Sequence, residues 1–475
     1  MKDYQISPDG NNGFISRKGI LTKMTKKIFL ILTFLAFSFI VKAQELPPIK
    51  ILRAEEDYSL LLNNDTLRTS LLINNLKAIP FNTSKSMYLS LGGEFRPRFE
   101  YTDNKNWSAG EKGDEVFYSQ RIMFHADLHL SEYFRVFVQL THGLLSLESP
   151  VYAQSDKLDL HQAFAEFRLP IESTLLKLRI GRQELLLGSG RLMAIRDGLN
   201  SRRSFEMARL MLLGKGYYAN AFVGREVKVP NDFFDNGSTD APYTWGLGLT
   251  VDTTNILGKT TIYYIGFDAK AVKYDDGMNP ETRHTIGVRR FGNIGENFRY
   301  NTEVNYQFGK FGNKTISAFS IEGDWHYNFI NTKFTPDLGI KLDYMSGDAA
   351  QNDGNLGTFN PYFNNPAYFG LITQVGAMNM FDIHPSIKLS LIENLGVAVE
   401  ADFYWRAELN DGLYSGSKAL LRPSNDNKSR FIGWQSGLKL DYDLNRYVTL
   451  SNETYYFVAG DFVKETGDAD RKSVV

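Results

Sequence analysis

The chain has 475 residues, enough for one large barrel or for two to three ordinary domains. Its net charge of −1 gives no reason to expect nucleic-acid binding, and a hydrophobic content of only 43% excludes a bundle of membrane-spanning helices. Cysteine is absent, which excludes disulfides, thiolate metal sites, thiol nucleophiles and an N-terminal lipid-modified cysteine.

The N-terminal part has the features of a secretory signal peptide. Lys26 and Lys27 precede an apolar run at 28–41 that is too short to span a bilayer comfortably, and small residues at the −3 and −1 positions place cleavage after Ala43. The alternative is an anchoring helix. We expect residues 1–23 to be an upstream extension, residues 24–43 a signal peptide starting at Met24, residues 44–85 a periplasmic lead-in and residues 86–475 one barrel domain.

Residues 88–101 show the repeating pattern of that domain. One phase carries Leu91, Phe95 and Phe99, while the other carries Glu94, Arg96, Arg98 and Glu100. Successive side chains of a strand point to opposite faces, and the charged face here is too charged for a packed core. Because Arg or Lys facing lipid at mid-membrane costs about 2–4 kcal/mol, the charged face is expected to point to water.

The same alternation predicts seventeen strands, most of them longer than the about 5–6 residues typical of globular proteins. Membrane barrels have even strand numbers, so we expect about 18 strands, with the last one missing beyond Val475 or the count wrong by one. The predicted strands are 86–102, 115–130, 132–143, 158–170, 173–187, 202–214, 216–228, 241–253, 259–271, 281–292, 296–309, 314–329, 334–346, 373–390, 394–408, 428–443 and 446–460.

The connections between these strands alternate between long and short. Outer-membrane barrels have short periplasmic turns and long extracellular loops, whereas soluble sandwiches and propellers have no reason for this asymmetry. The sequence therefore predicts an all-β fold, a single antiparallel transmembrane barrel in the lipid of the outer membrane of a Gram-negative bacterium.

Arginine is concentrated on the Gly-rich connection within 182–209. Planar guanidinium groups suit bidentate recognition of carboxylates and phosphates, so such a loop at a barrel mouth would form an anion pathway. The alternative is that these arginines pair with Glu184, Asp197 and Glu206 and only hold the loop. The arginines that we expect along the pathway are Arg96, Arg98, Arg121, Arg182, Arg191, Arg196, Arg202, Arg203 and Arg406.

In this stretch the chain resembles the alginate export family of outer-membrane barrels. The resemblance rests on residues 181–184, 188–192 and 200–205, with further similarity at 92–101 and 459–467. It implies an 18-stranded monomeric barrel whose basic lumen conducts an anionic uronate polysaccharide. Met207 replaces a glycine of the family pattern, and the mixed charges of the inward phase weaken the case for alginate itself. The family-motif residues are Gly181, Arg182, Gln183, Glu184, Asn200 and Phe205.

We therefore expect a passive channel for an acidic polysaccharide or oligosaccharide, not an enzyme, with charge-selected diffusion and no cofactor. No metal site is expected. Neighbours on the same face of a strand are about 6.8 Å apart, so His125 and His129, two such steps apart, are about 13 Å from each other and too far to share one ion. Two alternatives remain: a general porin for small solutes, and a glycan-binding surface barrel with a plugged lumen. Export and uptake both fit such a channel.

Overall fold

The computed structural model describes residues 46–69, 72–103, 114–146, 154–252, 258–370, 372–467 and 472–474. The expected upstream extension and signal peptide lie outside the described residues. Among the described residues, no helix is both long and apolar enough to cross a bilayer.

The described strands form one 20-stranded sheet and a separate two-stranded ribbon, β18 (Leu413–Tyr414) with β19 (Leu420–Arg422). Three strands of the large sheet are only two or three residues long: β1 (Ile79–Pro80), β15 (Asn355–Leu356) and β22 (Lys472–Val474). The other seventeen each overlap one predicted strand. They are β2 (Tyr88–Asp103), β3 (Asp114–His129), β4 (Phe134–Leu145), β5 (Asp156–Ile171), β6 (Thr174–Gln183), β7 (Phe205–Gly214), β8 (Tyr217–Glu226), β9 (Tyr243–Asp252), β10 (Lys259–Tyr274), β11 (Gly277–Ile294), β12 (Phe298–Phe311), β13 (Lys314–Asn328), β14 (Asp337–Met345), β16 (Met380–Ile392), β17 (Leu395–Arg406), β20 (Phe431–Asn445) and β21 (Val448–Ala459).

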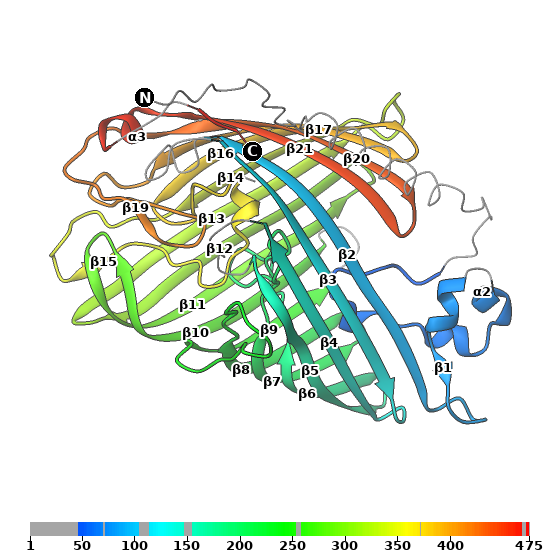
Figure 1. Cartoon of the computed structure of the whole chain (residues 1–475). Helices are drawn as coiled ribbons and strands as arrows, with labels where there is room; N and C mark the ends of the chain where they lie inside the picture. Colours follow the sequence, from blue (N-terminus) through cyan, green and yellow to red (C-terminus); the bar gives the residue numbers. More distant parts are fainter. Residues whose placement is uncertain are drawn as a thin grey trace, which may run out of the picture.

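These long strands pair in chain order and antiparallel, so the sheet curls into a barrel (Figure 1). The short β22 lies at the seam between the first and last long strands. It pairs with β21 through Tyr456 opposite Val474, and with β2 through Asp103 opposite the same residue. Among the described residues no ladder joins β2 directly to β21, so the barrel is open along most of this seam.

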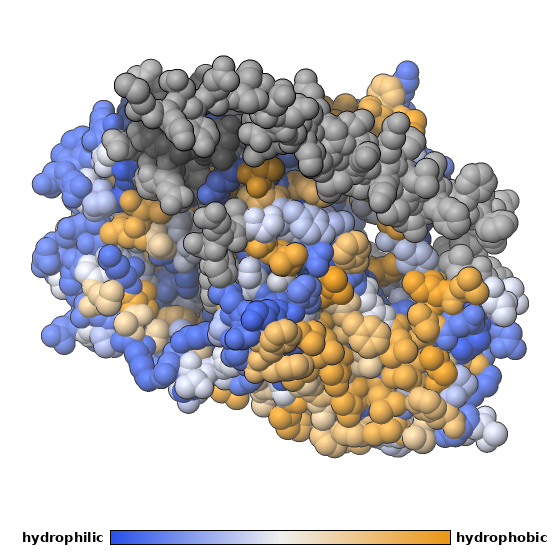
Figure 2. Space-filling model, in the orientation of Figure 1, coloured by the Kyte–Doolittle hydropathy of each residue, from blue (hydrophilic) through white to orange (hydrophobic). Residues whose placement is uncertain are grey.

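The two faces of the sheet differ as the alternation predicts. On β2 and β3 the outward side chains of Phe99 and Val116 are 68% and 73% exposed, whereas inward Arg121 is 1% exposed. Apolar side chains also gather on the outer surface over the β4–β7 region, while the end with the long loops is hydrophilic (Figure 2). The outside therefore suits lipid, and the polar side chains line the interior.

The two ends of the barrel also differ. Short turns such as 172–173, 215–216 and 446–447 lie at one end, and long connections such as 184–204, 346–379 and 407–430 start from the other. Strand β6 ends at Gln183, earlier than predicted, because residues 184–187 already turn into the interior. The loops carry η5 (Pro366–Phe369), and α3 (Asp461–Glu465) follows β21.

The lead-in before the barrel lies at the short-turn end (Figure 1). It contains η1 (Arg53–Glu55), η2 (Ser59–Leu62), α2 (Asp65–Thr69) and η3 (Leu72–Leu76), and β1 then pairs with β2. A small apolar cluster holds this region to the barrel rim and includes Leu61, Leu67, Ala78 and Tyr88.

Candidate functional site in the barrel interior

The loop 184–204 is anchored at its base by the family-motif residues. Gly181 has φ +129°, and a Cβ there would lie 2.3 Å from the carbonyl oxygen of Ala163, so only glycine fits without strain. The buried Gln183 amide donates to the carbonyl of Met207 at 3.2 Å. Where the loop begins, Glu184 accepts a hydrogen bond from Arg202 Nη2 at 3.2 Å, which joins the start of the loop to its end.

Two further motif residues, Asn200 and Phe205, fix the loop to its surroundings. Asn200 donates from Nδ2 to the carbonyls of Leu144 and Gln154 at 3.0 and 2.8 Å. The ring of Phe205 packs edge-on against Phe363 of the loop 346–379, with centroids 5.1 Å apart. The motif thus places the arginine-rich loop, and its matching residues have a structural role in this chain.

Arg191 shows that this loop crosses the interior. The loop leaves from β6, yet Arg191 reaches β12, β13 and β14, where it lies 3.8 Å from Glu303, 2.9 Å from Glu322 and 3.3 Å from Asp343. Its guanidinium also lies 4.3 Å from the ring centroid of Tyr368. A side chain bound to the far wall holds the loop inside the barrel.

The loop 346–379 meets the loop 184–204 in the interior. The backbone N–H of Ala194 donates to the carbonyl of Phe363 at 2.9 Å. Arg203 pairs with Glu226 at 2.7 Å and donates to the carbonyl of Asn364 at 3.1 Å. Aromatic and aliphatic side chains from both loops and the surrounding strands form one large buried cluster. Part of the interior is therefore filled by packed chain.

Three predicted arginines on β2 and β3 contact the near side of loop 184–204. Arg96 donates to the carbonyls of Asp197 and Leu199 at 2.6 and 2.9 Å, and Arg98 donates to that of Gly198 at 3.1 Å. Arg121 donates to the Asp197 carboxylate at 2.8 Å. The structure brings these three side chains together at one part of the interior.

The other predicted arginines are spread over different parts of the barrel. Arg182 pairs with Glu206 at 2.7 Å, and Arg196 lies within the loop at φ +52°. Arg406, on the far side of the barrel, donates to carbonyls of 407–430, including that of Asn427 at 2.8 Å. The pairs with Glu184, Asp197 and Glu206 match the alternative interpretation, in which arginines hold the loop. The anion-pathway role remains a prediction.

The interior also has an acidic side, whose residues the sequence did not predict to form one row. Glu303, Glu322, Asp343 and Asp382 lie directly opposite one another in register across β12, β13, β14 and β16, and each is at most 2% exposed. Like charges in direct cross-strand contact destabilise a sheet, so this row needs compensation. The inward phase of each strand would have indicated these residues, but only the register aligns them.

A basic row occupies the opposite part of the barrel. Arg135 on β4, Glu166 on β5, Arg179 on β6 and Arg209 on β7 are also direct cross-strand partners. Glu166 accepts from Arg135 Nε at 2.9 Å and from Arg179 Nε at 2.8 Å. The row itself has one carboxylate among three arginines, and Asp127 pairs with Arg135 at 3.0 Å as a second acid. Arginines therefore predominate in this row, whereas the opposite row is built of acids.

The lead-in reaches this basic row from the short-turn end. Arg135 donates to the carbonyl of Ala54 at 2.9 Å, and Arg202 donates to that of Ile51 at 2.7 Å. Glu55 pairs with Arg179 at 2.9 Å. Burial alone would raise the pKa of Glu55, but Arg179 and neighbouring cations hold it below its usual range. The segment 51–56 therefore occupies part of the lumen.

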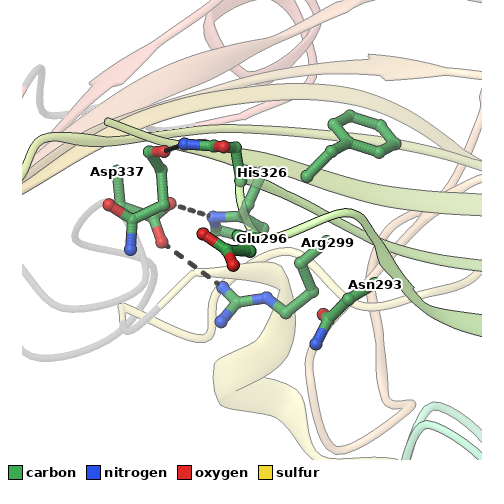
Figure 3. A pocket seen from close by; sticks show the side chains of 8 residues that line it. Asn293, Glu296, Arg299, His326 and Asp337 are labelled. Atoms are coloured by element: carbon green, nitrogen blue, oxygen red, sulfur yellow. Dashed lines mark hydrogen bonds and ion pairs between the residues drawn. The ribbon is translucent and has the colours of Figure 1, made fainter. Parts of the chain in front are cut away.

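A small polar pocket lies at the same end, between β12, β13 and β14 (Figure 3). His326 uses both ring nitrogens there: Nδ1 is 2.6 Å from Asp337 and Nε2 is 2.9 Å from Asp324. Arg299, 60% exposed, reaches Asp337 at 3.8 Å. These contacts tie the strand ends together.

Two carboxyl groups in the long loops, Asp348 and Asp411, should make the docking of these loops depend on pH. The backbone N–H of Asp348 donates to Asp411 at 2.9 Å, and burial raises the pKa of Asp348 to about 7 and that of Asp411 to about 6, well above the usual 3.8. The two carboxyl groups have higher pKa values in the folded than in the unfolded chain, so in their protonated forms they stabilise the docked loops. This stabilisation is complete below about pH 4 and is lost as the pH rises through about 6–7.

Hydrogen exchange of residues 346–358, corrected for intrinsic rates, should be faster at pH 8 than at pH 5. The Asp348→Asn variant should reduce the difference. Equal protection of the wild-type protein at the two pH values would contradict this expectation.

The fold is similar to that of outer-membrane porins. A BenF-like porin from Pseudomonas fluorescens Pf-5 has a TM-score of 0.53 at 11% identity, covering 82% of this chain and 97% of that chain. OccK8 (OprE) of Pseudomonas aeruginosa has a TM-score of 0.53 at 11% identity, covering 82% and 96%. Identities this low show the shared fold alone. No curated protein sequence matches the chain.

The fold and its polar interior define the class, a porin-like antiparallel β-barrel, and the family match identifies it as a transport channel of the Gram-negative outer membrane. Residues 87–475 match the family model described as alginate export. The chain therefore belongs to the alginate export family, which confirms the resemblance seen in the sequence.

Proposed function

We propose that this barrel passes an acidic polysaccharide or its oligosaccharides across the outer membrane by passive, charge-selected diffusion. The observation that supports this most directly is the clustering of arginines on β2–β7 and on the loop 184–204, opposite the acidic row on β12–β16. Arginine forks suit carboxylates, which acidic sugars carry on their rings. No proton-transfer step is needed, because selectivity follows from charge and width.

The test is the reversal potential of purified barrels in planar bilayers under a KCl gradient, where we expect chloride to be preferred over potassium. Reversing the charge at Arg98, whose side chain is 33% exposed, should lower this preference for chloride. At about 8 Å and an effective dielectric constant of about 20, a unit charge contributes about 2 kcal/mol before screening. Arg98→Glu should therefore lower the anion-to-cation permeability ratio several-fold.

Lys270→Glu is the matched control. Lys270 is 83% exposed on the outward phase of β10, so the same charge reversal outside the lumen should leave the permeability ratio nearly unchanged. A wild-type preference for cations, or an equal effect of the two substitutions, would overturn the anion pathway. A block of the ion current by uronate oligosaccharides, but not by neutral oligosaccharides, would then support an acidic cargo.

Two other functions have specific support. The porin-like fold suits a general channel for small solutes, which would conduct without discriminating between acidic and neutral sugars. The packed cluster of loops inside the barrel suits a glycan-binding surface barrel, which would show no conductance. The same bilayer recordings separate both from the proposed function.

A further inference from the structure

Three potential metal ligands converge on the inner face of β16 and β17. Asp382 and His384 lie on β16 and Asp402 lies on β17, and each side chain offers one ligand atom within 4.8 Å of the others. All three residues are at most 2% exposed. With small side-chain adjustments, such a group is compact enough to bind one ion.

Asp382 gives an independent reason to expect a ligand. Among the described residues, neither of its carboxylate oxygens has a hydrogen-bond partner, although the residue is 99% buried. Its direct cross-strand neighbour on β14 is another acid, Asp343. A buried, unpaired carboxylate costs several kcal/mol, so nearly every such group in a folded protein has a partner.

The cations nearest to Asp382, one on the loop 184–204 and one on β14, are engaged elsewhere. Arg191 donates to Asp343 at 3.3 Å, and Lys341, the cross-strand partner of His384, places its Nζ 4.6 Å from the ring centroid of Tyr368. Neither makes a hydrogen bond to Asp382. A bound cation would supply the missing partner.

The contacts of His384 orient its ring so that one nitrogen faces the proposed metal position. Its Nε2 lies 3.3 Å from Glu400, while its Nδ1 faces Asp402. Glu400 is itself fixed by the Tyr455 hydroxyl, which donates to it at 2.7 Å. Neither ring nitrogen makes a hydrogen bond among the described residues. With the proton on Nε2, beside Glu400, the lone pair of Nδ1 would be directed toward the two aspartates. A carboxylate behind the histidine is the usual support of a metal-bound imidazole.

The remaining contacts orient Asp402 and cover the site. The Gln435 amide donates to one Asp402 oxygen at 2.5 Å, and the other oxygen faces His384. The Tyr404 hydroxyl donates to the carbonyl of Phe369 at 2.7 Å, which holds the η5 turn of the loop 346–379 over this wall. The cluster is therefore enclosed by the inward-folded loop.

We propose that Asp382, His384 and Asp402 bind one divalent transition-metal ion of the Zn²⁺ or Mn²⁺ type. One imidazole nitrogen with two carboxylate oxygens suits these ions better than Ca²⁺, which prefers six to eight oxygens. The sequence alone did not identify the site, because its ligands come from two strands. The bound ion would neutralise part of the acidic row, and this site is independent of the cargo proposed above.

The test uses the purified full-length barrel in detergent, stripped with chelator and then titrated with Zn²⁺ or Mn²⁺ alone by calorimetry. Bound metal is counted by elemental analysis after desalting. Asp382→Asn and His384→Gln remove ligands with little change of shape, and Glu400→Gln tests the support of the histidine. His326→Gln is the matched control, because the two aspartates of His326 lie on opposite ring nitrogens and cannot share one ion with it.

We expect one metal ion per wild-type chain and per His326→Gln chain. The Asp382→Asn and His384→Gln variants should lose this binding, and Glu400→Gln should weaken it about 10–100-fold while keeping the stoichiometry. X-ray absorption should show one imidazole among light-atom ligands. Folding of every variant is checked by its heat-modifiable gel mobility. No binding by the folded wild-type barrel, or equal binding by folded His384→Gln, would overturn the proposal.

Discussion

Replacing Arg191 with methionine is expected to destabilise the barrel by about 3–5 kcal/mol, the usual cost of removing one partner from a buried ion pair. Arg191 is 1% exposed and is the cation between Glu303, Glu322 and Asp343. Without it, three buried carboxylates repel one another and the loop 184–204 loses its attachment to the far wall. The measurement is the free energy of unfolding in urea for the refolded barrel in micelles.

The same variant should also conduct more current than the wild type, because a released loop leaves a wider lumen. Arg191→Lys should lie between the two, since a single ammonium cannot replace a planar fork that reaches three acids. Arg299→Met is the control: this residue is 60% exposed with one contact at 3.8 Å, so its loss should cost less than about 1 kcal/mol. Equal stability of Arg191→Met and Arg299→Met would refute the assigned role of Arg191.

Replacing residues 51–56 with a Gly-Ser segment of the same length is expected to raise single-channel conductance about twofold or more and to strengthen the preference for anions. The segment lies in the lumen against Arg135, Arg179 and Arg202, and Glu55 neutralises one of these cations. Its removal both widens the path and frees positive charge in a narrow aqueous space, where charge determines which ions enter.

A Gly-Ser replacement of residues 82–86 is the matched control, because this turn lies at the same end of the barrel but its residues are exposed or half-buried outside the lumen. It should leave conductance unchanged. If the 51–56 replacement also leaves conductance unchanged, the lead-in does not obstruct the path. Recording both variants from the same preparation of lipid removes differences in bilayer thickness.

The sequence predicted the strands well because the signal for a strand is local. Phe95, Phe99 and Tyr101 alternate with Glu94, Arg96 and Arg98, and this period of two follows from the geometry of one strand in isolation. The long and short connections then indicated which end of the barrel each loop belongs to. All seventeen predicted strands are present in the structure, with shifts mainly where β6 and β16 adjoin loops that turn inward.

The residues of the interior were only partly predictable. The cluster of arginines in 182–209 and the motif at Gly181 and Asn200 were visible in the sequence, and so was their possible pairing with Glu184, Asp197 and Glu206. The row of Glu303, Glu322, Asp343 and Asp382 was not, because it depends on the register of four strands. A shift of one residue in any strand would turn its side chain to the opposite face.

By itself, the sequence determined the all-β class, the strand positions and which side chains face inward, because these follow from neighbours along the chain. Only the tertiary structure decided which groups meet across the lumen. Arg191 and Asp343 are 152 residues apart, and Arg179 and Glu55 are 124 apart. No periodic pattern links such positions; they are brought together when the sheet curls and when the loops and lead-in fold into its interior, where buried charges must find partners.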